Sequence, residues 1–165
     1  MIILTALLPL MALTSVLASA IVQRSGATDV KLRVKDTDDC LSKKPSPGDP
    51  NSFGASTEKC ADAPKWTINR DQPGKIQLAG SKDKVLESSQ GGVLVTLEAP
   101  EDGNKFQEWT FRDDGSIKNT FDGSSDQEYC LAKTTDPIFT MDLDDCPEAD
   151  AKLDEGDPRV WEIIE

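Results

Sequence analysis

Histidine is absent from the 165 residues of the chain. Ser-His-Asp and Cys-His mechanisms need an imidazole base, and many zinc sites need histidine ligands, so these classes of site are excluded. Paired carboxylates for glycoside hydrolysis stay open, but the 30 acidic residues guarantee chance pairs and no pair is singled out. We therefore predict that the protein is not an enzyme and needs no cofactor.

An excess of positive charge is also lacking, because 18 Lys and Arg residues against 30 Asp and Glu residues give a net charge of −12. Nucleic acids and anionic membranes attract surfaces rich in Lys and Arg, so neither is an expected partner. Asp142-Leu143-Asp144 looks like the start of a calcium loop, but Cys146 occupies the fifth position and the required glycine is missing. We predict no metal site.

Long apolar runs are lacking after the first residues of the chain. Ile2–Leu17 is almost unbroken in its hydrophobicity, and Ala18-Ser19-Ala20 follows as a small-x-small cleavage pattern. The run is short for a membrane span and contains Pro9, which favours a signal peptide over residues 1–20 rather than a membrane anchor. We expect a secreted, extracellular protein without a membrane span.

Three segments of the chain share one pattern. Gln107-Glu108-Trp109 leads into a short apolar segment and an Asp-Gly turn, and weaker copies surround Trp66 and Trp161. Gly74 and Gly115 stand 41 positions apart in two of these copies. A second marker recurs at intervals of 45 positions, as Cys40-Leu41, Val85-Leu86 and Cys130-Leu131. Self-similarity at a fixed period indicates an architecture of repeats, here three of about 43 residues each.

The four cysteines form an even set in a chain that we expect to be secreted, which indicates a disulfide framework. Of the three possible connectivities, the repeat favours Cys40–Cys60 and Cys130–Cys146. Cys40 and Cys130 are equivalent, and each is followed by a second cysteine within its own repeat. Each bridge would contribute on the order of 3 kcal/mol. Zinc is disfavoured because no Cys-x-x-Cys spacing occurs.

Helical periodicity is scarce, whereas apolar and polar residues alternate over several short segments. Clusters of Gly, Pro, Asp and Ser separate these segments at short intervals, which is typical of an all-β sandwich or barrel. The predicted strands cover residues 30–34, 66–68, 75–78, 92–97 and 138–141.

Two segments are predicted as loops. The segment 45–50 contains Pro45, Pro47 and Pro50, which makes it too rich in proline for a strand ladder. We predict a surface excursion that the Cys40–Cys60 disulfide holds at its base. The segment 142–157 is acidic, and we predict a loop inserted into the third repeat.

Each repeat contributes one tryptophan: Trp66, Trp109 and Trp161. One repeat cannot bury its apolar face alone, whereas three repeats around an axis can form a closed core. We predict that the three indoles are structural and converge on that core. Exposed platforms for stacking against a sugar are the less favoured interpretation.

With this order of motifs, the chain resembles the ricin B-type β-trefoil lectins and would be a divergent secreted member. The resemblance rests on the Cys-Leu and Val-Leu pairs, the second cysteines and the tryptophan of each repeat. It covers residues 30–165, after a short lead-in over 21–29. It implies an all-β fold, a β-trefoil with three repeats around a pseudo-three-fold axis. It also implies carbohydrate binding, with the Gln-x-Trp residues mainly structural.

The resemblance places the sugar contacts at positions where this chain departs from the family. The family has an Asp after the Cys-Leu pair, and the matching residues here are Ser42, Glu87 and Ala132. Only Glu87 retains a carboxylate. The family also has an aromatic platform shortly before the second cysteine, where this chain has Glu58 and Asp144. A sugar site of the usual form is therefore expected in neither the first nor the third repeat.

The second repeat keeps more of the pattern. Phe106 stands where the family usually has Asn, Asn104 lies two positions earlier, and Gln107 matches the family. The resemblance implies one altered site. Glu87 would accept hydrogen bonds from sugar hydroxyls, Asn104 would donate and accept, and Phe106 would offer an apolar platform next to Gln107.

The leading expectation is a carbohydrate-binding protein whose partner is a glycan or a glycoprotein. A scaffold for protein binding, such as a protease inhibitor or a secreted effector, is the alternative, because loops on a rigid barrel vary freely. The excursion over 45–50 and the acidic loop around Asp150 are the segments that we would expect to contact a protein target. The sequence sets no oligomeric state.

Overall fold

The computed structural model describes residues 28–89, 94–121, 128–135, 141–148 and 151–165. These residues form strands and one short 3-10 helix, with no α-helix among them, so the predicted all-β class is confirmed for the described part. None of the helical structure described there is long and apolar enough to cross a membrane. The signal peptide predicted over 1–20 lies outside the described residues.

The elements are β1 (Thr28–Val34), β2 (Asp39–Ser46), β3 (Asp49–Lys59), β4 (Trp66–Ile68), β5 (Gln77–Leu78), β6 (Val85–Ser88), β7 (Val95–Glu98), η1 (Lys105–Gln107), β8 (Trp109–Phe111), β9 (Ile117–Asn119), β10 (Tyr129–Lys133), β11 (Met141–Asp145) and β12 (Trp161–Ile164).

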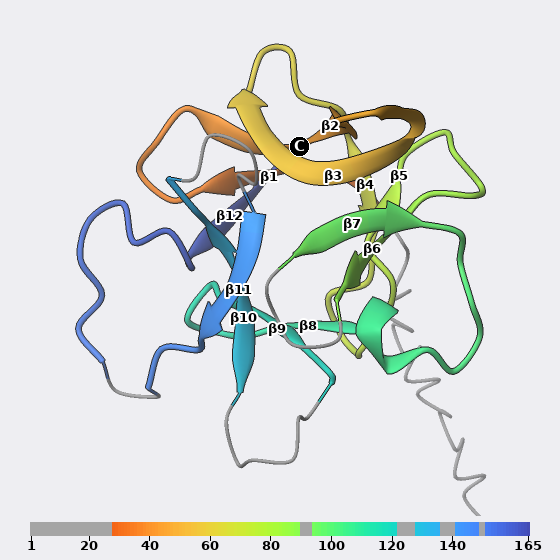
Figure 1. Ribbon diagram of the computed structural model, residues 1–165. Coiled ribbons are helices and arrows are strands. Elements are labelled where there is room, and N and C mark those ends of the chain that lie inside the picture. Colours follow the sequence, from red (N-terminus) through yellow and green to blue (C-terminus); the bar gives the residue numbers. More distant parts are fainter. Residues whose placement is uncertain (1–27, 90–93, 122–127, 136–140, 149–150) are drawn as a thin grey trace, which may run out of the picture.

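Seven of these strands close into a ring (Figure 1). Antiparallel pairing runs in the order β1-β2-β3-β7-β6-β5-β4, and β4 returns to β1 with Val30 opposite Trp66. β12 adds to the same sheet by pairing with β1, which places Trp161 opposite Val34. The first and last described strands are therefore neighbours, although they lie at opposite ends of the domain in sequence.

The other four strands form a second antiparallel sheet in the order β11-β10-β9-β8. Two isolated bridges, Gly74 to Trp109 and Ser116 to Val160, join this sheet to the first. The Trp109 amide donates to the Gly74 carbonyl at 2.8 Å, and the Trp161 amide donates to the Gly115 carbonyl at 2.9 Å. The turn glycine that follows one tryptophan thus lies against the next tryptophan along the chain.

Gly115 shows why that turn needs glycine. Its φ of +86° lies in the left-handed region, which L side chains rarely adopt. A Cβ at this position would lie 3.0 Å from Val160 Cγ1 and 3.1 Å from the Trp161 carbonyl oxygen. The repeat signal at Gly115 therefore reflects a close approach of backbone to β12.

The three tryptophans are buried, with exposed fractions of 0% for Trp66, 0% for Trp109 and 4% for Trp161. Each indole Nε1 donates to the carbonyl of the leucine in its own repeat's Cys-Leu or Val-Leu pair. The distances are 3.0 Å from Trp66 to Leu41, 3.1 Å from Trp109 to Leu86, and 2.9 Å from Trp161 to Leu131. A buried indole N–H needs such a partner. The same hydrogen bond recurs in all three segments, so the two sequence markers meet in space.

The structure contains the two disulfides that the repeat predicts, Cys40–Cys60 and Cys130–Cys146. Cys40 lies on β2, and Cys60 directly follows β3, so the first bridge joins the base of the β2–β3 hairpin. Cys130 lies on β10, and Cys146 directly follows β11, so the second bridge has the same relationship to the β10–β11 hairpin. In the β6–β7 hairpin, buried Val85 occupies the equivalent position.

The segment 45–50 lies mostly exposed beyond the Cys40–Cys60 disulfide, as predicted, but the prediction that its prolines exclude it from a ladder is wrong. β2 and β3 extend into this segment, with Pro45 opposite Phe53, Ser46 opposite Asp49, and a register shift between Pro45 and Ser46. A proline lacks the N–H of a ladder, but it is accommodated at edges and bulges. Gly48, with φ of +86°, makes the turn. The segment is thus the end of a long β-hairpin, which Figure 1 shows curving across the top of the molecule.

The prediction of a loop over 142–157 is wrong in its first part. Asp142–Asp145 belongs to β11 and pairs with β10, where Leu143 lies opposite Leu131. Alternation places Leu143 toward the core, while Asp144 and Asp145 are exposed. The exposed acidic residues therefore gave this strand the composition of a loop. The described residues between β11 and β12 contain no strand. Of the strand predicted over 138–141, residues 138–140 lie outside the described part.

Candidate functional site

Glu87 and Gln107 form the centre of the candidate site. Glu87 lies on β6 and is half-buried, and Gln107 ends η1 with an exposed fraction of 1%. The Gln107 Nε2 donates to Glu87 Oε2 at 2.6 Å and to the Ala99 carbonyl at 2.8 Å. Its Oε1 accepts from the Glu101 amide at 2.8 Å. Because Gln107 is buried and both its amide nitrogen and its amide oxygen are hydrogen-bonded, it fixes the orientation of Glu87 from the interior side.

Asn104 holds the same carboxylate from the surface. Its Oδ1 caps η1 by accepting from the Phe106 amide at 3.0 Å. Its Nδ2 donates to Glu87 Oε2 at 3.3 Å and to Glu101 Oε2 at 3.2 Å. Both amide side chains therefore converge on one oxygen of Glu87. Within the described residues, Glu87 Oε1 has no hydrogen-bond donor, and a carboxylate oxygen can accept from a ligand hydroxyl.

An aromatic pair lies next to these polar groups. The rings of Phe106 and Phe121 stack with centroids 4.3 Å apart and an interplanar angle of 25°. Buried Asn119 ties the two segments together, since its Nδ2 donates to the Phe106 carbonyl at 3.1 Å and its Oδ1 accepts from the Phe121 amide at 3.1 Å. Phe121 was not predicted from the sequence, because it follows β9 and belongs to no recurring motif.

An open groove of about 510 Å³ runs along this surface. Its lining residues are Glu101, Asp102, Gly103, Asn104, Lys105, Phe106 and Phe121. Of the four predicted contact residues, Asn104 and Phe106 line the groove. Glu87 and Gln107 do not line it and are connected to it through hydrogen bonds with Asn104 and Glu101. The structure thus brings the four residues together in two layers.

The equivalent positions in the other two repeats have different chemistry. Ser42 is buried, and its hydroxyl donates to the exposed Glu58, the residue at the family's platform position. Ala132 is buried and carries no polar group, and Asp144 is exposed. Only the second repeat therefore combines a carboxylate, an amide and an aromatic surface at these positions.

The comparisons with known proteins support the fold. No protein-family model matches the chain, and no curated protein matches it in sequence. A solved structure of the β-trefoil lectin of the Vibrio vulnificus hemolysin/cytolysin, with N-acetyl-D-lactosamine bound, is similar to it with a TM-score of 0.62. The match covers 84% of this chain and 94% of the Vibrio chain at 15% sequence identity. The chain therefore has an all-β fold similar to that of a β-trefoil lectin.

Proposed function

We propose that the protein is a secreted carbohydrate-binding protein, a divergent ricin B-type β-trefoil built from three repeats. The three tryptophan-to-leucine hydrogen bonds support the repeat plan, since one contact recurs in each segment of about 43 residues. The three hairpins β2–β3, β6–β7 and β10–β11 support it as well, because each begins at the Cys-Leu or Val-Leu marker.

The observation that carries the proposal is the arrangement of Glu87 beside the groove. Two amide side chains hold one carboxylate oxygen of Glu87 and leave the other free to accept from a hydroxyl. The Phe106 and Phe121 rings supply an apolar surface for the C–H face of a pyranose. Convergent polar groups around an apolar surface are the usual chemistry of a small-molecule site. Asn104 and Gln107 then act mainly by positioning Glu87.

N-acetyl-D-lactosamine is the first ligand to test, because the similar Vibrio lectin was solved with it bound. A single shallow site binds weakly, so the assay needs high protein concentration or multivalent display. We expect the oxidised protein to bind one class of glycan on an array, and the free sugar to compete.

Two variants test the site itself. Glu87→Gln removes the charge while retaining an amide oxygen, and Phe106→Ala removes part of the apolar surface. Each variant should bind the glycan about tenfold more weakly, because the first loses one charge-assisted hydrogen bond and the second loses one aromatic contact. Glu98→Gln, at the exposed last residue of β7, changes the net charge equally outside the groove and should leave binding unchanged. A blank array with folded protein, or equal losses in all three variants, would contradict the proposal.

Protein binding is the second candidate function, and the length of the first hairpin favours it. β2 and β3 have 8 and 11 residues, whereas β6 and β7 have 4 each and β10 and β11 have 5 each. The tip residues Pro47, Gly48, Asp49 and Pro50 are exposed. Replacing 45–50 by a short Asn-Gly turn should abolish binding to a protein target while leaving glycan binding intact.

A further inference from the structure

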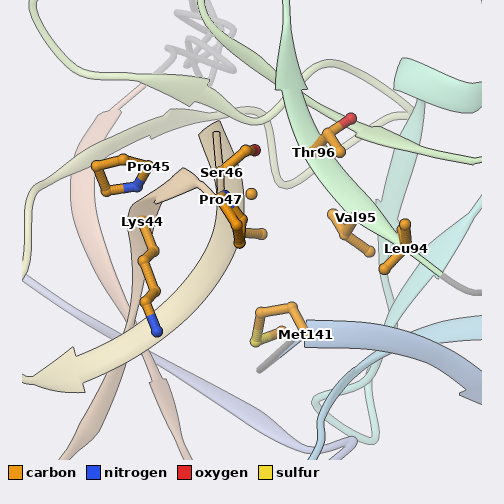
Figure 2. A pocket seen from close by; sticks show the side chains of 10 residues that line it. Lys44, Pro45, Ser46, Pro47, Leu94, Val95, Thr96 and Met141 are labelled. Atoms are coloured by element: carbon orange, nitrogen blue, oxygen red, sulfur yellow. The ribbon is translucent and has the colours of Figure 1, made fainter. Parts of the chain in front are cut away.

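A second cavity lies where the hairpins of the three repeats meet, and it shares no lining residue with the groove at Phe106. Figure 2 shows the end of the β2–β3 hairpin on one side of it, β7 on the other, and Met141 at the start of β11 between them. The cavity has a volume of about 200 Å³. An apolar cavity of about 150 Å³ is large enough to hold a benzene ring, so this one can take a small molecule.

The cavity exists because the three repeats contribute side chains of unequal size. Ala55, Val95 and Met141 are equivalent, since each lies two residues before the strand residue that faces the marker leucine of its hairpin. All three are buried, with exposed fractions of 5%, 3% and 1%. Protein interiors are normally packed without voids of this size. The methyl group of Ala55 leaves space that a larger side chain would fill.

The lining is mostly apolar, and its polar residues are Ser46, Thr96 and the cation Lys44. Pro45, Pro47, Leu94, Val95 and Met141 provide most of the walls. Lys44 is the only charged residue among the described lining residues, and none of the described ion pairs involves it. In Figure 2 its side chain lies on the same side as the two prolines, opposite Leu94 and Val95.

The neighbouring lysine has a different environment. Lys43 Nζ lies 4.9 Å from the centroid of the Phe53 ring, and Lys43 is not among the lining residues. The register places Lys43 opposite Ala55 and Lys44 opposite Gly54, so the two lysines lie on opposite faces of the hairpin. Lys43 and Lys44 therefore form a matched pair of exposed cations, of which one lines the cavity.

We propose that this cavity binds a small amphipathic carboxylate, with a short acyl chain in the apolar space and the carboxylate at Lys44. The walls favour a hydrocarbon tail, since burial of each methylene is worth roughly a fourfold gain in affinity. Lys44 favours an anionic head group by a charge-assisted hydrogen bond. This site is distinct from the carbohydrate site and does not depend on it.

Met141 offers a direct reporter for the test. Met1 and Met11 are the other methionines of the chain, and both precede the described residues. We would label the methionine methyl groups of the full chain with ¹³C and titrate butanoate, hexanoate and octanoate, with hexanol as the uncharged probe. The Met141 methyl signal should shift saturably. Affinity should rise roughly fourfold per methylene until the cavity is full.

Three variants decide the assignment. Ala55→Leu should fill the space and abolish the shift of Met141. Lys44→Gln should weaken hexanoate roughly two- to fivefold, as for an exposed ion pair, and leave hexanol unchanged, whereas Lys43→Gln should change neither. The lysine variants lie at exposed positions, so they test the proposal even where Ala55→Leu does not fold. No saturable shift with any acid, or equal losses in the two lysine variants, would overturn the proposal.

Discussion

The Nε2 atom of Gln107 lies 2.6 Å from Oε2 of Glu87, which joins the Gln-x-Trp motif of the second repeat to the residue after its Val-Leu pair. The two residues are 20 positions apart in sequence. Gln107 is buried, whereas Glu87 is half-buried, so the amide supports the carboxylate from the interior. This contact explains how a structural residue can determine the geometry of a surface site.

Gln107→Leu should reduce both stability and sugar binding. The substitution leaves the Glu101 amide and the Ala99 carbonyl without their partner, which should lower the free energy of unfolding by roughly 1–3 kcal/mol. Urea denaturation and glycan affinity would be measured together. Gln77→Leu is the control, because Gln77 also makes a side-chain bond, to Ser81, but outside the site. Sugar affinity that falls equally in both variants would contradict a specific role of Gln107.

Gly115→Ala should be more destabilising than Gly103→Ala. Both glycines have positive φ, +86° and +75°, so alanine is strained by about 1–2 kcal/mol at either position. Only at Gly115 would the new Cβ also meet neighbours, Val160 and the Trp161 carbonyl at 3.0 and 3.1 Å, whereas at Gly103 it meets nothing within 4 Å. Urea denaturation should show an additional loss of roughly 1–3 kcal/mol at Gly115. Equal losses would show that backbone strain alone determines the cost.

Much of the core could be predicted from the sequence, because its determinants recur. The marker leucines recur at a constant interval of 45 positions, and one tryptophan follows each of them. A position that recurs in three segments must satisfy the same packing three times. The structure brings Trp109 to Leu86 and Gly115 to Trp161 accordingly. The strand over 66–68 was predicted with the bounds that the structure gives.

The errors lie where local composition opposes the tertiary environment. Pro45 led to the prediction that this segment would not pair as a strand, but the long hairpin accommodates it next to an irregularity in register. Asp142–Asp145 had the charge of a loop, but pairing with β10 and burial of Leu143 make it a strand. Propensity is a weak guide to strands, because side-chain packing decides.

The candidate site was predictable only in part. Glu87, Asn104, Phe106 and Gln107 could be proposed from their positions within one repeat. Phe121 could not, because its contact with Phe106 depends on Asn119, which joins two segments that are not adjacent in sequence. The apolar cavity was not predictable either, since it arises from the sizes of side chains contributed by three separate hairpins.

Replacement of each tryptophan by phenylalanine should give similar losses of stability. Each substitution leaves a leucine carbonyl without its donor and removes part of a buried ring, for a cost of about 2–4 kcal/mol. Thermal and urea denaturation of Trp66→Phe, Trp109→Phe and Trp161→Phe would check this. Phe111→Leu, at a half-buried position, is a milder control. A tryptophan whose loss costs almost nothing but removes sugar binding would instead be an exposed platform.

Asp157 should make the stability of the protein depend on pH. Its side chain is only 8% exposed, and it accepts from the Arg159 amide at 2.9 Å, from Nε at 3.0 Å and from Nη2 at 2.8 Å. The hydrogen bonds from the Arg159 side chain hold the pKa of Asp157 below its usual value, against the opposing effect of burial. The pair precedes Trp161, so it fixes the chain where it enters β12.

A carboxyl group whose pKa is lower in the folded than in the unfolded state stabilises the fold above its unfolded pKa of about 3.9, and this contribution is lost as the pH falls through the folded pKa. Asp157→Asn should therefore be less stable than the parent at pH 7, by roughly 1–3 kcal/mol, and the difference should shrink below about pH 4. Urea denaturation across this pH range would measure it. Asp113→Asn, at an exposed turn, is the control for net charge. A difference that stays constant from neutral to acidic pH would show that Asp157 acts through packing and not through its ionised form.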